Sequence, residues 1–374
     1  MKVLQVVPEL NEGGVERGTL EVGRFLVREG HEAVVISHGG RLVPVLVAAG
    51  VRHVAMPVHR KGPLGLLWIR PLRRWLRRER PDILHLRSRW PAWLAWLAWR
   101  GLDPAGRPRL VTTVHGFYSV NAYSAIMMRG ERVIAVSDSI RAYILRHYPG
   151  TEPDRIRVIP RGVDPQEFPR GFRPDATWWE RWRREHPQLN GRRLVTLVGR
   201  LTRLKGHEDF LQVLVRLRDR WPGVAGVVVG GVARGKERYR GELLREVERL
   251  GLKSRVWFLG HRSDVREILA VSDVVCSLSR QPESFGRTSL EALALGRPVV
   301  GYDHGGVGEQ LRVFLPEGAV RPGDVDAAAA VVSRFLESPP EPRPVGPPYT
   351  LEAMCRSTLA VYEELLSGGA LVQH

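Results

Sequence analysis

The sequence predicts an α/β protein made of two Rossmann-like domains, each with a parallel β-sheet covered by helices on both faces. Three observations indicate this class. Short runs rich in Val, Ile and Leu alternate with longer segments of helical periodicity, which is the pattern of buried parallel strands joined by helices. The alternation stops near residue 165 and starts again after Gly191. The chain has 374 residues, which is enough for two domains that each bury a core.

Seven apolar runs in the first half predict β-strands. Between the first two of them, the spacing of apolar residues over 15–28 predicts a helix. Together these elements predict a first domain over residues 1–165. The expected strands are residues 3–7, 33–37, 54–58, 83–86, 110–114, 133–136 and 156–159.

The second half repeats this pattern. Residues 166–190, which are rich in Pro, Trp and Arg, predict a linker followed by a helix, and a second domain is expected over 191–345. A proline-rich stretch then leads to a final helix over 351–366, so that residues 346–374 are expected to form a C-terminal segment able to cross back to the first domain. The strands expected in the second domain are residues 194–198, 226–229, 256–259, 274–278 and 299–301.

Positive charge is concentrated in the first half. The chain has 57 Lys and Arg against 40 Asp and Glu, a net charge of +17, and residues 51–100 hold 12 basic and two acidic residues. The expected helix around Pro71 is basic, with Leu72, Trp75 and Leu76 on one side. Such a helix either rests on an anionic membrane surface, with residues 60–100 as the contact, or lies solvated on the protein. Nucleic acid is not expected as a partner, because no helix-turn-helix, zinc-finger or aromatic RNA-binding signature accompanies the charge.

The apolar runs, the N-terminus and the cysteines indicate the cellular compartment of the protein. No apolar run reaches the roughly 18 residues of a membrane-spanning helix. The apolar run at the N-terminus is short and is followed by Glu9, which favours a strand over a signal peptide. Two cysteines, Cys276 and Cys355, cannot form a disulfide framework or a cysteine metal cluster. We therefore expect a cytoplasmic protein, with a peripheral place on the inner face of the cytoplasmic membrane as one option.

The first loop of interest joins the first strand to the first helix and contains Gly13 and Gly14. Paired glycines at a helix start allow close backbone approach and present N–H groups to a phosphate. The loop lacks the Gly-x-Gly-x-x-Gly pattern, and the second strand ends in Ser37-His38-Gly39, without an acid for a ribose hydroxyl. A nicotinamide dinucleotide site is therefore disfavoured.

Two further loops follow strands of the second half, where ligands of doubly wound sheets bind. One runs from Gly199 to Gly206 and places Arg200 and Lys205 beside a helix start, an arrangement that suits a diphosphate. The other contains Glu283 and leads into a helix that carries Glu291. Two carboxylates spaced in this way can bind hydroxyls at opposite ends of one ligand.

At these residues the chain resembles the retaining GT-B glycosyltransferases of family four, over nearly its whole length. The strongest part of the resemblance is the glutamate pair with seven residues between, Glu283 and Glu291. The stretch 13–17 and the first half are similar to lipopolysaccharide-core glycosyltransferases in particular. The other matching stretches are residues 159–164, 199–205, 258–260 and 305–309.

The resemblance implies a fold of two Rossmann-like domains that face each other across a cleft, with the second domain binding a nucleotide-diphosphate sugar. Arg200 and Lys205 would hold the diphosphate, Glu291 the ribose and Glu283 a hydroxyl of the sugar. Backbone groups of the loops would bind sugar and phosphate, and the stretch after Gly260 would meet the base. The residues implied for those last two roles are Gly14, Phe285, Gly286, Arg287, His261 and Arg262.

In the first domain, the resemblance implies that His115 faces the sugar being transferred. Arg17, His85 and Arg87 are expected on the acceptor side. Arg161 stands where the family usually has asparagine, and it either adds a cation or changes the hinge.

No metal and no cofactor are expected. Asp324 and Asp326 match the Asp-x-Asp motif of metal-dependent transferases of another fold. Because they precede an alanine-rich helix, they are expected to cap that helix. Arg200 and Lys205 can take the place of a divalent cation at the diphosphate.

The expected activity is transfer of a sugar from a UDP-, GDP- or ADP-linked donor to a glycan or glycolipid acceptor, with retention of configuration, in the synthesis of lipopolysaccharide or another cell-surface glycan. Two alternatives remain open at this point. The same fold serves nucleotide-sugar epimerases. A degenerate scaffold could also serve as a non-catalytic protein that binds polyanions or membranes.

Overall fold

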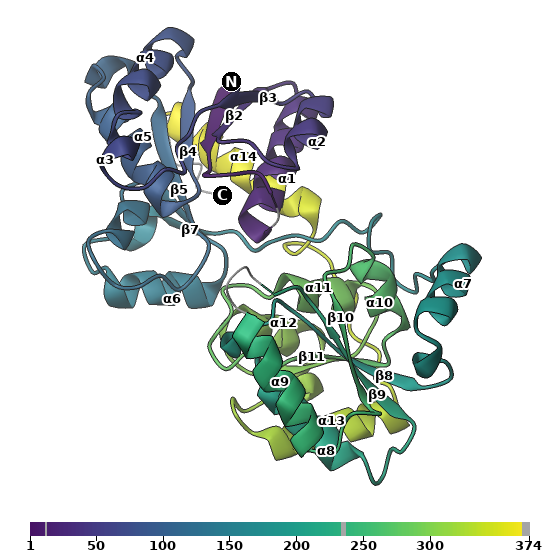
Figure 1. Ribbon diagram of the computed structural model, residues 1–374. Coiled ribbons are helices and arrows are strands. Elements are labelled where there is room, and N and C mark those ends of the chain that lie inside the picture. The colour runs from purple at the N-terminus through teal and green to yellow at the C-terminus, as the bar shows by residue number, and fades with distance from the viewer. Residues whose placement is uncertain (12, 233–236, 369–374) are drawn as a thin grey trace. The chain divides into compact units, whose positions relative to one another are not determined.

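The computed structural model describes residues 1–11, 13–232 and 237–368 (Figure 1). The chain divides into two compact units. The first consists of Met1–Gly162 and Pro348–His374, and the second of Val163–Pro347. The segment 166–190, expected as a linker, belongs to the second unit, and the described part of 346–374 belongs to the first from Pro348 onward.

The first unit is built on a seven-stranded sheet in the order β3-β2-β1-β4-β5-β6-β7, in which every neighbouring pair is parallel. Its strands are β1 (Lys2–Val6), β2 (Glu32–Ser37), β3 (Arg52–Ala55), β4 (Ile83–Leu86), β5 (Arg109–Val114), β6 (Arg132–Ala135) and β7 (Ile156–Val158). Its helices are α1 (Gly14–Arg28), α2 (Val43–Ala48), α3 (Pro63–Leu66), α4 (Ile69–Glu79), α5 (Arg89–Arg100), α6 (Asp138–His147) and α14 (Leu351–Leu366).

The second unit has a six-stranded parallel sheet in the order β10-β9-β8-β11-β12-β13. Its strands are β8 (Arg193–Val198), β9 (Val224–Val229), β10 (Val256–Gly260), β11 (Val274–Ser277), β12 (Val299–Tyr302) and β13 (Ala319–Val320). Its helices are α7 (Ala176–Glu185), α8 (His207–Leu217), α9 (Glu237–Arg249), α10 (Val265–Val271), α11 (Arg287–Ala294), α12 (Gly305–Phe314) and α13 (Val325–Glu337).

The predicted fold class is confirmed, since both sheets have the doubly wound order in which the first strand of each unit lies at the centre. The strand order reverses between β1 and β4 in the first unit and between β8 and β11 in the second. At such switch points the loops after neighbouring strands lead away on opposite faces, which leaves room for a ligand at the carboxyl edge.

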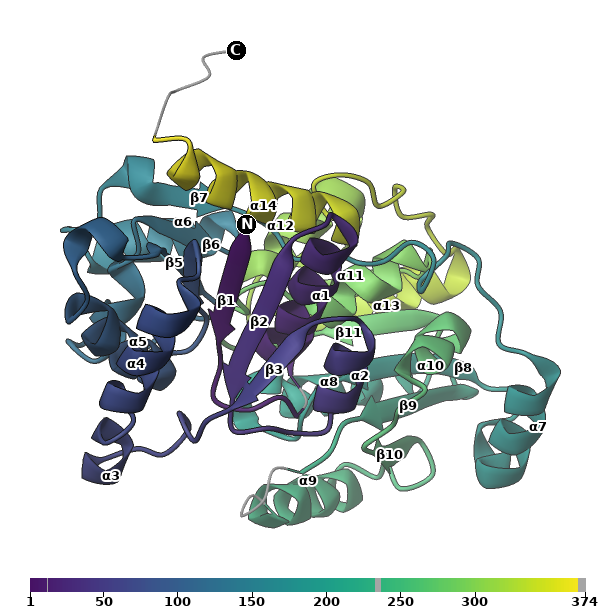
Figure 2. The same ribbon diagram turned by 90° about the horizontal axis from the view of Figure 1, so that it is seen from above.

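The C-terminal helix α14 completes the core of the first unit. In Figures 1 and 2 this yellow helix lies along α1, and its buried residues join those of α1 and the sheet in one apolar cluster. Its side chain Tyr362 is fully buried. The final helix was expected over the same residues, 351–366.

The helix α7 is fixed to the second sheet by tryptophans. Trp178 and Trp182 are buried and stacked, with ring centroids 5.0 Å apart, and they pack in a cluster with Leu194 of β8 and Val227 of β9. This packing explains why the Trp-rich segment before residue 190 belongs to the second unit.

The basic helix α4 is amphipathic as predicted, but its apolar side is not available to a membrane. Leu72, Trp75 and Leu76 are all buried in the first unit, while Arg74 and Arg77 are exposed. The expectation that this apolar side could rest on a membrane is therefore wrong, because the side chains already pack against the protein. No helix within the described ranges is both long enough and apolar enough to cross a bilayer.

Candidate active site

The carboxyl edge of the second sheet brings together the loops after β8 and β11. The loop after β8 runs through a short 3-10 turn, Arg203–Lys205, to Gly206, whose φ of +70° lies in the left-handed region. A Cβ at Gly206 would stand 1.7 Å from the carbonyl oxygen of Leu278, so the absence of a side chain there lets the two loops touch.

Across this contact, Lys205 and Glu283 form an ion pair with 2.8 Å between Nζ and Oε2. The hydroxyl of Ser279 also donates to Glu283 Oε1. Burial alone would raise the pKa of Glu283, but the charge and hydrogen bond of Lys205, with help from Ser279, outweigh it and lower the pKa. Glu283 is therefore ionised at neutral pH, and it stands beside a cation that is still partly exposed.

The loop that carries Glu283 is held by side chains that the sequence analysis did not single out. The buried carboxylate of Asp209, on α8, accepts hydrogen bonds from Arg280 at 2.6 Å and from the hydroxyl of Tyr302 at 2.7 Å. The ring of His304 meets the carbonyl oxygen of Ser279 at 2.8 Å. These partners come from different strands, helices and loops. Their spacing along the chain therefore does not predict that they meet.

The same loop turns into α11 at a second glycine in the left-handed region. Gly286 has a φ of +85°, and a Cβ there would stand 2.4 Å from Val307. Phe285 is buried beneath the turn, and its carbonyl oxygen accepts a hydrogen bond from Gln310 at 2.6 Å. Arg287 is the first residue of α11.

Glu291 lies one turn into α11 and is only 7 % exposed. The structure thus places Glu283 in the loop after β11 and Glu291 on the helix that follows it, as the spacing of the two glutamates predicts.

Arg200 and the stretch after β10 border this group. Arg200 follows β8, is exposed, and forms no ion pair with another residue of the described ranges. His261 follows β10 and is exposed. Arg262 is different, because its guanidinium binds both carboxylate oxygens of Asp264 at 2.8 Å and lies 3.4 Å from Glu185 of α7. These contacts make Arg262 a support of the loop after β10.

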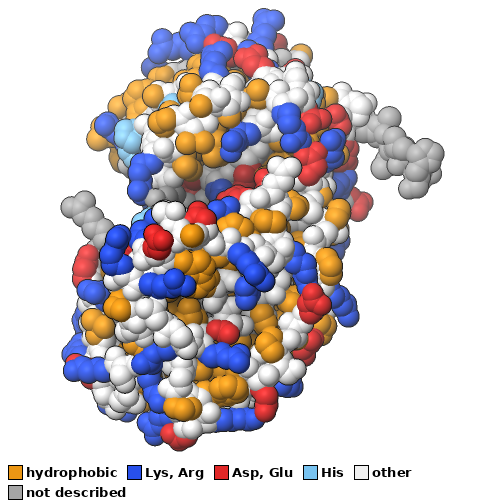
Figure 3. Space-filling view, turned by 90° about the vertical axis from the view of Figure 1, so that its right-hand side faces the viewer, with side chains coloured by type: hydrophobic (Ala, Val, Ile, Leu, Met, Phe, Trp, Pro, Cys, Tyr) orange, Lys and Arg blue, Asp and Glu red, His pale blue; other side chains and the backbone are white. Residues whose placement is uncertain are grey.

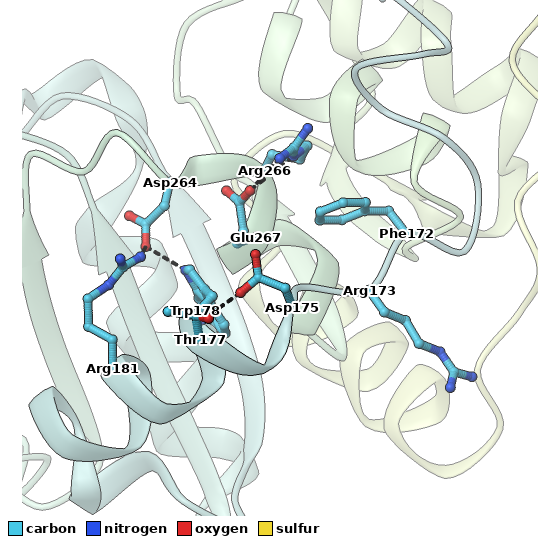
Figure 4. A pocket seen from close by; sticks show the side chains of 9 residues that line it. All are labelled: Phe172, Arg173, Asp175, Thr177, Trp178, Arg181, Asp264, Arg266 and Glu267. Atoms are coloured by element: carbon cyan, nitrogen blue, oxygen red, sulfur yellow. Dashed lines mark hydrogen bonds and ion pairs between the residues drawn. The ribbon is translucent and has the colours of Figure 1, made fainter.

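A pocket of about 330 Å³ lies beside this support, between the segment 172–181 and α10 (Figure 4). Most of the charged side chains that line the pocket form ion pairs or hydrogen bonds with one another. Asp264 accepts a hydrogen bond from the indole of Trp178 at 2.7 Å and lies 3.8 Å from Arg181, and Arg266 pairs with Glu267 at 2.6 Å. We assign this pocket no ligand.

Three predicted residues of the first unit lie at the carboxyl edge of its own sheet. Gly14 is exposed at the start of α1, Arg17 lies in the same helix turn, and His115 follows β5. His115 Nδ1 accepts a hydrogen bond from Arg161, which follows β7.

His85 and Arg87 close β4 but are interior residues. The two ring nitrogens of His85 meet Tyr362 Oη and Thr113 Oγ1, each at 2.6 Å, and the residue is fully buried. Burial, together with the charges of Arg87 and Arg161, lowers its pKa well below the usual value. The expectation that His85 lines the acceptor side is wrong, because α14 covers it. Arg87 is 2 % exposed and donates to Gln5 at 2.9 Å.

Asp324 caps α13 as predicted. Its side chain accepts a hydrogen bond from the backbone N–H of Ala327 at 3.0 Å. Asp326 instead pairs with Arg216 of α8. Helix capping therefore accounts for the first aspartate of this Asp-x-Asp sequence, and an ion pair for the second.

Two family models match the chain. The first, Glycosyltransferase Family 4, covers residues 12–167, and the second, Glycosyl transferases group 1, covers residues 180–346. Among curated relatives, the D-inositol 3-phosphate glycosyltransferase of Segniliparus rotundus is 28% identical over 255 residues, which are 66% of this chain and 55% of that protein. The chain thus spans about half the length of the curated relatives that it matches.

Solved structures match it over nearly its full length. A glycosyltransferase from Rickettsia africae has a TM-score of 0.84 and 27% identity, covering 98% of this chain and 99% of that one. HepE from Anabaena, solved in complex with UDP and glucose, has a TM-score of 0.81 and 21% identity, covering 98% of this chain and 100% of that one. At 21% identity, the similarity to HepE supports the assignment of the fold.

Proposed function

This chain belongs to the glycosyltransferases that combine a family 4 domain with a group 1 domain, and from this premise we propose that it moves a sugar from a nucleotide-diphosphate sugar to an acceptor hydroxyl. The observation that carries the proposal is the ion pair of Lys205 with Glu283 at the switch point of the second sheet. Both groups come from loops that follow strands, where nucleotide ligands of such sheets bind.

The cations of this edge would bind the leaving diphosphate. Arg200 and Lys205 follow β8, and the N-terminus of α11 directs its N–H groups and the positive end of its dipole to the same edge. Charge that develops on the departing diphosphate would be stabilised by groups already in place. These fixed cations support a reaction that needs no divalent metal.

The two glutamates would hold hydroxyls of the donor. Glu283 is ionised and can accept hydrogen bonds from a sugar hydroxyl, while Glu291 would accept those of the ribose. In the second unit, the backbone of residues 285–287 and the stretch at His261 would complete the donor contacts. In the first unit, Gly14 and His115 are the residues that the resemblance assigns to the donor. We expect transfer with retention of configuration, through attack of the acceptor on the face that the diphosphate leaves.

A screen of UDP-, GDP- and ADP-linked sugars tests the proposal, with analysis of the products. One donor is expected to release its nucleoside diphosphate and to give a product with the donor's anomeric configuration. An epimerase would instead return the nucleotide sugar with an altered sugar. A scaffold that only binds polyanions would leave every donor unchanged, and either result would refute the proposal.

The acceptor is proposed to be carried at a membrane, in the synthesis of lipopolysaccharide or another cell-surface glycan at the cytoplasmic face. The support comes from α3 and the residue after it, where Leu64, Leu66 and Leu67 are 68%, 46% and 68% exposed. The neighbouring basic residues Arg60, Lys61, Arg70 and Arg74 are exposed as well. Exposed apolar side chains with cations close by in the sequence suit the boundary of an anionic bilayer.

The distribution of charge elsewhere is different. On the face drawn in Figure 3, Lys and Arg side chains are scattered among acidic and apolar ones. The exposed leucines of α3 and the residue after it are the feature to test.

Sedimentation with vesicles tests the membrane contact. The chain is expected to bind vesicles that contain anionic lipid and to bind neutral vesicles much more weakly. A Leu64→Glu, Leu67→Glu double variant should lose most of this binding, since two charges would replace the inserted apolar groups. Leu244→Glu is the control, because Leu244 is 40% exposed on α9 of the second unit. Equal binding to both vesicle types, or equal binding by all variants, would refute the contact.

A further inference from the structure

The buried cation Arg161 lies beside His115, the histidine that we propose faces the sugar. It is 8 % exposed and lies just after β7, and its guanidinium donates a hydrogen bond to Nδ1 of His115, which follows β5. Its other terminal nitrogen lies 3.9 Å from the sulfur of Met354 on α14. All three residues belong to the first unit.

The backbone around Arg161 is held by close packing. A Cβ on Gly162 would stand 2.3 Å from the carbonyl oxygen of Thr350, the residue that caps α14. A Cβ on Gly18 of α1 would stand 2.9 Å from Arg161 Nη1 and 3.0 Å from Arg87 Nη2. Gly18 therefore makes room for the guanidinium beside α1, and Gly162 lets the backbone next to Arg161 approach the start of α14.

The hydrogen bond fixes the state of the ring. A guanidinium has five N–H donors and no acceptor, and it does not lose its proton in proteins. Nδ1 of His115 must therefore carry the lone pair, and the proton of the neutral ring is on Nε2. Asparagine, which the resemblance leads us to expect at this position, could accept from Nδ1 or donate to it and would not force this choice.

We propose that Arg161 is a positioning residue that keeps His115 neutral and protonated on Nε2, so that His115 donates a hydrogen bond to a hydroxyl of the transferred sugar. The inference rests on the proposed function for the role of His115, but the state of the ring can be measured without it. A positive charge beside Nδ1 opposes a second proton on the ring. His115 then serves as a fixed donor and not as an acid or base.

Other charged and titratable groups surround this pair. Tyr118 Oη accepts a hydrogen bond from the backbone N–H of His115 at 3.1 Å, and its pKa is raised, mainly by burial. Arg89 of α5 lies over the Tyr118 ring at 4.6 Å. Arg87 lies beside Arg161 at Gly18. The charge of Arg161 also acts on His85, whose pKa is lowered mainly by burial, and on Cys355, whose thiol has its pKa raised to about 12, mainly by burial.

Nitrogen NMR of the histidine rings, at several pH values, reads the state directly. The His115 signal is assigned by its loss in the His115→Gln variant. In the unsubstituted chain, the expected result is a proton on Nε2, none on Nδ1, and no titration between pH 6 and 8. A proton on Nδ1, or titration near the ordinary histidine pKa of about 6.5, would overturn the inference.

Two substitutions at Arg161 separate charge from structure. Arg161→Met keeps much of the side chain's apolar contact but removes its charge. In this variant His115 should titrate near pH 6.5. Because only about a quarter of the rings would then be neutral at pH 6, turnover at pH 6 should be roughly 4-fold lower than at pH 8. Arg161→Lys, which keeps the charge and a donor, should restore the flat profile. If Arg161→Met fails to fold, the NMR measurement on the original chain remains decisive, because a proton on Nδ1 or titration of the ring would still overturn the inference. If the chain transfers no sugar at all, the NMR result stands and only the proposed function fails.

Discussion

At the scale of single residues, Glu283 is a carboxylate paired with Lys205, the cation that we propose binds the leaving diphosphate. Burial opposes its charge, but Lys205 and Ser279 together lower its pKa. Lys205 therefore contributes most to keeping Glu283 ionised. A bound diphosphate would attract the same ammonium group, so donor binding and the electrostatics of Glu283 are coupled through one side chain.

Single residues were predictable from the sequence where a motif fixed them. Lys205, Glu283 and Glu291 follow strands at spacings that place them at one edge of the sheet. The partners that hold them, Asp209 and His304, lie on separate elements and became visible only in the fold. The interior position of His85 was missed because the strand pattern did not show that α14 packs over it.

At the scale of elements, apolar runs predicted most of the strands, and the spacing of apolar residues predicted α1. The strand expected over 54–58 begins and ends earlier, at Arg52–Ala55. The strand β13 was not predicted, because Ala319–Val320 is too short to give a pattern. The side of α4 that is buried could not be decided from its sequence, since an apolar stripe serves a membrane or a protein core equally well.

The contact between the loops after β8 and β11 gives a prediction at this scale. Gly206→Ala would bring Cβ into the Leu278 carbonyl, whereas Gly251 has a similar φ of +68° and nothing within 4 Å of a Cβ. We expect Gly251→Ala to cost about 1–2 kcal/mol of unfolding free energy, the cost of the left-handed backbone alone. Gly206→Ala should cost clearly more and should also weaken nucleotide binding.

Denaturant unfolding and nucleotide titration of the two alanine variants check this difference. If both lose the same stability and both bind nucleotide like the original chain, the packing of the two loops does not position the site. The comparison is matched, because each change adds one methyl group at a left-handed glycine of the second unit.

At the scale of the whole molecule, each unit is a doubly wound sheet with candidate residues at its own carboxyl edge. The fold class was predictable because alternating strands and helices leave few topologies, and crossovers between parallel strands are right-handed. The acceptor was less predictable. The membrane contact that we propose for it involves Leu64 and Leu67, whose exposure is a property of the folded chain.

The central claim is that Arg200 and Lys205, at the carboxyl edge of the second sheet, bind the diphosphate of a nucleotide sugar. Calorimetric titration of the full chain with UDP, GDP and ADP, in the presence of a metal chelator, tests it most directly. One nucleotide should bind, and Lys205→Met should weaken it by roughly 10-fold or more, the effect of one charged hydrogen bond. Lys253→Met, at an exposed site of the same unit, should leave it unchanged. Binding that requires a divalent cation, or that is indifferent to Lys205→Met, would contradict the claim.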